Sequence, residues 1–163
     1  TWLMGGVLPT SVTCVTQQIK PTVYPKVDDE ATIIVTYPGA QGIIQGSWNW
    51  PTHRKDLEVY GQRGYVIAAD RVTLRTRMGQ PDTEHTETLP APSAPFDDVF
   101  AFFAAVLGNA VLGNAALGNA APLTTGHMTL SSLGNNLSVV RILEAARDSA
   151  RLGRTVSLAT PVE

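Results

Sequence analysis

The chain has 163 residues, of which 44% are hydrophobic and 16% are charged; this is the composition of a globular protein and excludes a disordered one. Its length predicts one domain, residues 1–163. The net charge is −2 with scattered basic residues, and no stretch reaches the roughly 18 apolar residues of a membrane span. Neither nucleic acid nor a membrane is therefore an expected partner.

The first half of the chain predicts antiparallel strands joined by short turns. After a helix end at residues 1–6, alternating or β-branched runs predict strands at residues 11–18, 31–37, 41–50, 56–60, 65–69 and 71–78. Pro38 and Gly39 supply the turn after the second of these strands. Within residues 41–50 the alternation places Ile44, Trp48 and Trp50 on one face.

The second half predicts two helices and a closing strand. Residues 79–95 hold four prolines and read as an extended, unpacked segment. A helix then opens at Pro95 with Ser93 as its cap, and its apolar stripe consists of Phe96, Val99, Phe100, Phe103 and Leu107. A second helix covers residues 135–152, ends at Gly153 and precedes a strand at 155–158. Its predicted core face consists of Val139, Leu143, Ala146 and Ala150.

This order of elements predicts an α+β fold, with a large open, mostly antiparallel sheet and two helices on one face. Between the helices, residues 107–121 repeat the pentapeptide LGNAV, LGNAA, LGNAA. Three units are too few for one stable coil of a pentapeptide β-helix. We therefore interpret the repeat as a locally duplicated loop or an engineered segment.

No motif of the chain predicts catalytic, cofactor-binding or metal-binding residues. The sequence contains neither GxGxxG after a strand nor GxxxxGK, so a phosphate-binding loop is missing. His53, His85 and His127 lie far apart, without the spacing of metal ligands. Cys14 is the only cysteine, and its alternating surroundings predict a small buried hydrophobe.

Two sets of residues are candidates for surface function. Lys20, Tyr24 and Lys26 lie in a basic, aromatic and irregular loop, which favours contact with a polar substrate; the alternative is an ordinary exposed connection. Trp48, Trp50 and Tyr60 are candidates for an oligomer interface, and both tryptophans also suit the sheet core or stacking on a sugar.

The acidic run from Asp28 to Glu30 stands at a strand entry. Paired carboxylates can serve acid–base chemistry, but neighbouring residues of a strand point to opposite sides. We therefore interpret the run as a solvated strand end beside Lys26.

Several segments together resemble the carboxy-terminal domain of the Gfo/Idh/MocA family of NAD(P)-dependent oxidoreductases, the glucose-fructose oxidoreductase type. They are TWLMG, TQQIKPTVYPKVDDEATIIVTYP, QGSWNWP, KDLEVYGQRGYV and LSSLGNNLSVVRILEAARDSARLGRTVSL, in the family's order. Two departures are Gly134, where the family commonly has Glu, and the tandem repeat. They put residues 125–136 in doubt as a normal family surface.

The resemblance implies a sheet domain that closes the substrate cleft of a sugar or polyol oxidoreductase and forms its subunit interface. The family's Rossmann half, which binds NAD or NADP, and its catalytic segments have no counterpart in these 163 residues. We expect the chain to bind no cofactor alone, to form a homo-oligomer through sheet packing, and to be cytoplasmic. The alternatives are a stand-alone binding or assembly module, an engineered scaffold, or one subunit of a split oxidoreductase.

Overall fold

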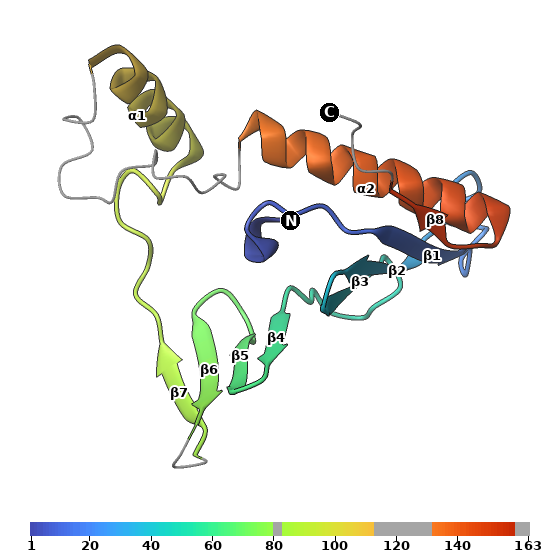
Figure 1. The fold of residues 1–163 in the computed structure, drawn as a ribbon, viewed down its shortest axis with the longest axis horizontal. Helices are drawn as coiled ribbons and strands as arrows, with labels where there is room; N and C mark the ends of the chain where they lie inside the picture. The colour runs from blue at the N-terminus through green and yellow to red at the C-terminus, as the bar shows by residue number, and fades with distance from the viewer. Residues whose placement is uncertain (80–82, 113–131, 159–163) are drawn as a thin grey trace. The chain divides into compact units, whose positions relative to one another are not determined.

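The computed structural model describes residues 1–79, 83–112 and 132–158 (Figure 1). The chain divides into two compact units, residues 1–50 with 123–163 and residues 51–122, and each is described by itself. The predicted α+β class is confirmed, because two long helices accompany antiparallel strands. The strands differ from the expectation of one large sheet, since within the described residues they pair as two sheets of four strands each.

The first unit contains the sheet β3-β2-β1-β8, preceded by the short 3-10 helix η1 (Trp2–Met4). Its strands are β1 (Ser11–Gln17), β2 (Glu30–Tyr37), β3 (Ala40–Ser47) and β8 (Val156–Ser157). Val12 pairs with Val35, and Ile33 pairs with Ile44. The predicted turn between β2 and β3 is confirmed at Gly39, whose φ of 77° favours glycine.

The third predicted strand ends earlier than expected. β3 stops at Ser47, so the prediction of a strand through Trp50 was wrong for its last three residues. The Ser47 hydroxyl accepts a hydrogen bond from the Asn49 amide (3.0 Å), and the Trp48 amide donates to the Asp29 carbonyl (2.9 Å). The first of these bonds is a local turn bond, and the second is the last main-chain contact with the β2 side beyond the Glu30–Ser47 pair, after which the strand does not continue.

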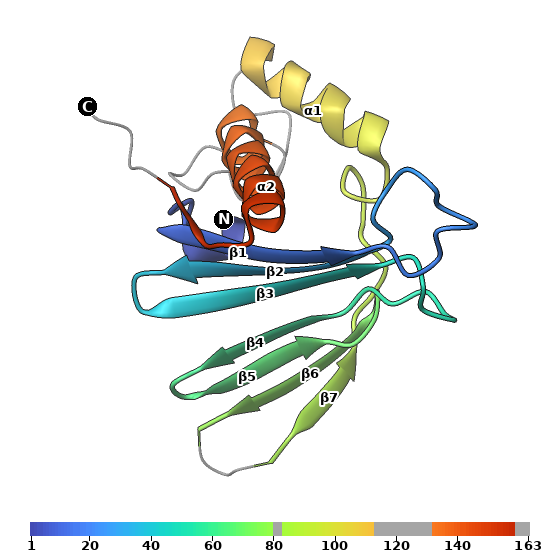
Figure 2. The ribbon, with the colours of Figure 1, turned by 90° about the vertical axis from the view of Figure 1, so that its right-hand side faces the viewer.

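Helix α2 (Leu133–Leu152) lies along the sheet of the first unit, over β1 and beside β8 (Figure 2). It begins after Ser132, whose side chain accepts a hydrogen bond from the Asn135 amide (3.2 Å). It ends at Gly153, which has a left-handed φ of 63°, as predicted. Both ends are therefore fixed by local capping chemistry.

The core of the first unit joins one face of β1 and β2 to one face of α2. Its buried members are Val12, Cys14, Val35, Tyr37, Ile142, Ala145 and Ala146. The prediction of a buried Cys14 is confirmed, and burial raises the pKa of its thiol.

The predicted core face of the second helix was wrong in part. Ala146 is buried and Ala150 packs against the core, whereas Val139 and Leu143 remain 38% and 49% exposed. Ile142 is the large aliphatic residue of α2 that is buried. Apolar residues occur on more than one side of this helix, so helical periodicity alone does not identify the side that faces the sheet.

The second unit contains the sheet β4-β5-β6-β7 and helix α1 (Val99–Leu112). Its strands are β4 (Leu57–Gly61), β5 (Gly64–Ala68), β6 (Thr73–Met78) and β7 (His85–Thr88). The expectation that residues 79–95 form no packed element was wrong at β7, which pairs with β6. Glu84 accepts two hydrogen bonds from Arg75 (2.9 and 2.8 Å), which anchors the entry to β7.

Helix α1 begins later than predicted. The Asp98 carboxylate accepts hydrogen bonds from the amides of Phe100 (2.9 Å) and Ala101 (2.7 Å), so Asp98 caps the helix in place of Ser93. Its predicted apolar stripe is exposed, with Phe100 at 78%. The expectation that both helices cover one face of a sheet stays a prediction. Of the tandem repeat, residues 107–112 belong to α1 and residues 113–121 lie outside the described residues.

Candidate functional site in the β1–β2 loop

The predicted substrate-facing residues lie in one ordered loop, residues 18–29, between β1 and β2. Lys20 and Lys26 are exposed there, and Tyr24 is half-buried. The loop has no regular strand or helix; the Lys20 carbonyl accepts hydrogen bonds from the Val23 (3.0 Å) and Tyr24 (2.9 Å) amides, and side chains add further bonds to the main chain. Gln18 and Asp29 supply the side-chain bonds.

Asp29 is the anchor of the loop. Its side chain accepts hydrogen bonds from the amides of Ile19 and Lys20, both 2.7 Å long. Its carbonyl accepts from the Trp48 amide (2.9 Å) and from Nδ2 of Asn49 (3.1 Å). Asp29 is only 3% exposed, so the prediction that this acid belongs to a solvated strand end was wrong.

The charge of Asp29 is stabilised by its surroundings. Burial by itself would raise the pKa of this carboxyl, but the hydrogen bonds from the Ile19 and Lys20 amides lower the pKa below its usual range. An ionised carboxylate that accepts two amide bonds is a structural clamp, because both of its oxygens are already engaged. Asp29 is therefore a poor candidate for acid–base catalysis.

Gln18 closes the other side of the loop. Its Nε2 donates to the carbonyls of Tyr24 (2.5 Å) and Val27 (3.3 Å). The Tyr24 ring lies against the Trp48 ring, with centroids 4.9 Å apart and an interplanar angle of 58°. We call this pair the aromatic corner. Trp48 is 60% exposed, so the interpretation of Trp48 as a core residue was wrong.

The structure joins Tyr24 from one candidate set to Trp48 from the other. No pattern in the sequence predicted this contact, because Tyr24 and Trp48 are separated by two strands and a turn. Trp50 is half-buried after the aromatic corner. Tyr60 belongs to the second unit; it is 67% exposed, and its ring lies 5.7 Å from the Tyr65 ring. The Tyr60 hydroxyl donates to Glu58 (2.7 Å).

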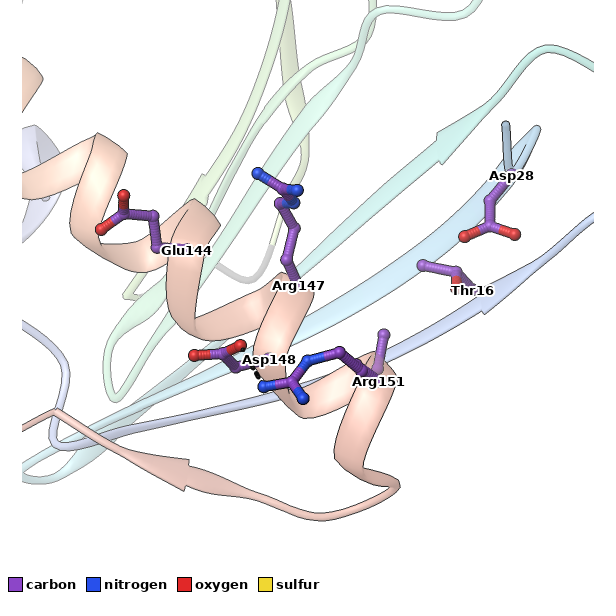
Figure 3. Close-up of a pocket in the computed structure, with 7 residues that line it drawn as sticks. Thr16, Asp28, Glu144, Arg147, Asp148 and Arg151 are labelled. Atoms are coloured by element: carbon purple, nitrogen blue, oxygen red, sulfur yellow. Dashed lines mark hydrogen bonds and ion pairs between the residues drawn. The ribbon is translucent and has the colours of Figure 1, made fainter. Parts of the chain in front are cut away.

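An open groove of about 600 Å³ lies beside α2 in the first unit. It is lined by Thr16, Asp28, Glu144, Arg147, Asp148, Ala150 and Arg151. Figure 3 shows Thr16 and Asp28 on the side opposite the α2 residues, with Arg151 paired to Asp148 at 2.9 Å. Both partners of this pair are more than half exposed, so the pair contributes little stability. Sequence reasoning missed this grouping because it joins a helix to distant strand ends.

Every strand pairing among the described residues is antiparallel, so these strands do not form the parallel crossover of a Rossmann dinucleotide fold. Within residues 1–79, 83–112 and 132–158, no three potential ligands gather as a metal site. In the same parts of the chain, no helix has the length and apolarity needed to cross a membrane.

Comparison with known proteins finds a family model that matches the first part of the chain. Residues 1–67, which include the β1–β2 loop and the aromatic corner, match the family model described as the GFO/IDH/MocA C-terminal domain. The predicted resemblance to the Gfo/Idh/MocA carboxy-terminal domain is confirmed. The match to this Gfo/Idh/MocA domain runs from η1 through most of β5, so it takes in both candidate sets. No curated protein sequence matches the chain.

Solved structures of oxidoreductases share the fold of this chain. One is an oxidoreductase from Agrobacterium radiobacter in complex with NAD+, L-tartaric acid and magnesium (TM-score 0.65, 22% identity, 92% of this chain and 43% of that chain). Another is an inositol dehydrogenase homolog from Azotobacter vinelandii complexed with NADH and myo-inositol (0.61, 17%, 93% and 44%). A third is myo-inositol 2-dehydrogenase from Lactobacillus plantarum (0.56, 18%, 93% and 42%). The chain thus spans less than half the length of each.

Loss of the Asp29 carboxylate should loosen the β1–β2 loop. In Asp29→Asn, one of the two amide bonds loses its acceptor and the other keeps only a neutral one, so we expect faster hydrogen exchange at the Ile19 and Lys20 amides. Because the folded pKa is lowered, the carboxylate stabilises the fold fully above the ordinary value of about 3.9, and this contribution is lost as pH falls through the folded pKa. Urea unfolding at several acidic pH values should therefore show a shallower loss of stability in Asp29→Asn than in the wild type.

The neighbouring variant Asp28→Asn is the control for the exchange experiment. Its carboxyl lines the groove beside α2 and accepts no hydrogen bond from the amides of Ile19 and Lys20. The exchange rates of these two amides should stay at the wild-type level. Equal exchange in Asp29→Asn and Asp28→Asn would show that Asp29 is not the anchor.

Proposed function

We propose that this chain is the carboxy-terminal sheet domain of an NAD(P)-dependent sugar or polyol oxidoreductase. The observation that carries the proposal is the family match over residues 1–67, which contains the ordered β1–β2 loop. In this role the chain contributes walls of the substrate cleft and a subunit interface. In the whole enzyme, hydride passes between a nicotinamide cofactor and a carbon of the sugar or polyol.

Substrate contact is assigned to the β1–β2 loop, with Lys20, Tyr24 and Lys26 as the contacting residues. Three facts support this assignment: both lysines are exposed, the loop is held by Asp29 and Gln18, and Tyr24 packs on an exposed tryptophan. A loop that is ordered and carries exposed basic and aromatic groups is suited to recognition. The chain supplies no catalytic group in this proposal.

The subunit interface is assigned to sheet surface. Large apolar side chains are exposed on the strands, among them Val15 (62%), Ile43 (63%) and Leu57 (49%). Of the three predicted interface residues, Tyr60 is the one that lies on a strand, β4, and it is exposed. Tyrosine is enriched at the centres of interfaces. Exposed apolar surface of this kind favours association with a second copy of the chain.

Titration of the purified 163-residue chain with NADH tests the cofactor part of the proposal. We expect no saturable change in NADH fluorescence, because the described strands offer no parallel crossover for a dinucleotide. NADPH, titrated under the same conditions, should give the same result. Saturable binding of either nucleotide by this chain alone would contradict the proposed division of labour.

A further inference from the structure

We propose that the second unit is a conditionally folded part of the chain: its sheet opens while the first unit stays folded, and association with a second copy closes it. The opening step rests on the burial and bonding of the second unit alone. The association step deepens the proposed function and rests on the subunit interface assigned there.

Buried hydrophobic side chains occur in one of the two units only. Those in the described parts of the chain all belong to the first unit, where they join β1 and β2 to α2. In the second unit, none of the described side chains is buried. A sheet becomes stable when it buries its hydrophobic face against another layer. The described part of the second unit therefore lacks the interior that stabilises the first.

The second unit nevertheless has an apolar face that needs cover. Strand pairing places Leu57 of β4 in one row with Leu74 of β6, and Val59 directly beside Val66. Residues two apart in a strand share a face, so these four side chains lie on the same side of the sheet. Leu57 and Val59 are 49% and 41% exposed. Helix α1 adds no interior, since Phe100 is 78% exposed.

The side-chain bonds of the second unit lie at its surface. Arg75 pairs with Glu84 and Arg54 pairs with Asp56, both at 2.8 Å, and the two arginine side chains are 43% and 52% exposed. The Tyr65 hydroxyl donates to Glu84 (2.6 Å) in an equally exposed position. Bonds in this setting contribute little to stability, because water competes for the same groups. Regions with few buried contacts and exposed bonds open ahead of the rest of a protein.

Association closes the second unit by mass action. A partner that binds the folded state and not the open one stabilises the folded state, and the effect grows with concentration. The proposed interface residue Tyr60 lies on β4 within the second unit and is 67% exposed. A second copy that covers this surface binds the closed sheet. The interface is therefore completed by the association that uses it.

Hydrogen exchange of the 163-residue chain, followed by mass spectrometry at a series of protein concentrations, tests both steps. The strands compared are β2 and β5, which each have a neighbouring strand on both sides. In dilute solution we expect protection of β5 to be at least about tenfold lower than that of β2. Protection of β5 should rise over the concentrations at which light scattering shows association, while that of β2 stays constant.

Equal protection of β2 and β5 in dilute solution would overturn the opening step. Constant protection of β5 while light scattering shows association would overturn the association step. A chain that stays single at every concentration contradicts the proposed interface and the association step with it, whereas the opening step is still decided by β5. Failure of this proposal and failure of the proposed function are therefore distinguishable.

Gly64→Ala tests the independence of the two units. A Cβ at Gly64 would lie 1.8 Å from the Arg77 carbonyl oxygen, so the substitution breaks the pairing of β5 with β6. We expect loss of protection in β5 with β2 unchanged. Gly61→Ala, in the same hairpin, is the matched control, because its Cβ meets the Gly64 carbonyl oxygen at an ordinary 3.8 Å. Loss of protection in β2 together with β5 in Gly64→Ala would show that the units unfold as one, against the proposal.

Discussion

Replacing Ile142 with alanine should destabilise the first unit by about 2–5 kcal/mol. Ile142 is 7% exposed on α2 and belongs to the cluster that joins this helix to β1 and β2. Its truncation removes buried methyl groups and leaves a cavity that the packed strands fill only in part. Urea unfolding followed by circular dichroism measures the loss.

Leu143→Ala is the matched control for this prediction. The sequence pattern assigned Leu143 to the core, but the residue is 49% exposed. Its truncation should therefore cost clearly less than that of Ile142, because half of the side chain already contacts water. A larger effect for Leu143 than for Ile142 would mean that α2 faces the sheet with the side predicted from the sequence.

The second large effect is expected at Ser149, which is fully buried on α2. Its Oγ accepts a hydrogen bond from the Cys14 amide at 2.8 Å. β8 pairs with β1 only at Ser11 and Val12, so it does not reach the amide of Cys14. The serine hydroxyl thus replaces a missing strand partner. Ser149→Ala leaves this buried amide without its acceptor, and we expect a loss of about 1–3 kcal/mol.

Ser138→Ala, on the same helix, separates this role from a general effect of losing a serine. The Ser138 hydroxyl donates to the Gly134 carbonyl of its own helix (2.9 Å). This exposed bond lies within α2 and links the helix to no other element. Its removal should be nearly neutral. Equal losses of stability in Ser149→Ala and Ser138→Ala, measured by urea unfolding, would contradict the proposed contact with Cys14.

The strands of this fold could be predicted because their sequences carry local signals. β-branched runs located β1 and β2, and Pro38 with Gly39 located the turn that follows. The division of the strands into two sheets has no such signal, since pairing between distant strands depends on the whole chain. β7 was missed because four prolines nearby outweighed its short alternating run.

The candidate site was predictable only in part, and for a similar reason. The composition of the loop singled out Lys20, Tyr24 and Lys26, and the structure places all three in one ordered segment. The contact between Tyr24 and Trp48 depends on where β3 ends, which the alternation of residues 41–50 did not show. Asp29 looked like a solvated acid because the amides that bind it lie ten and nine residues earlier in the chain.

We propose that this chain is a sheet platform that associates with its own copies. The most direct test is the mass in solution, measured by light scattering during size-exclusion chromatography of the 17.4 kDa chain. We expect a mass of at least twice the chain mass, and a shift toward the single chain in Tyr60→Ala. A homogeneous species of 17.4 kDa in the wild type would contradict the account.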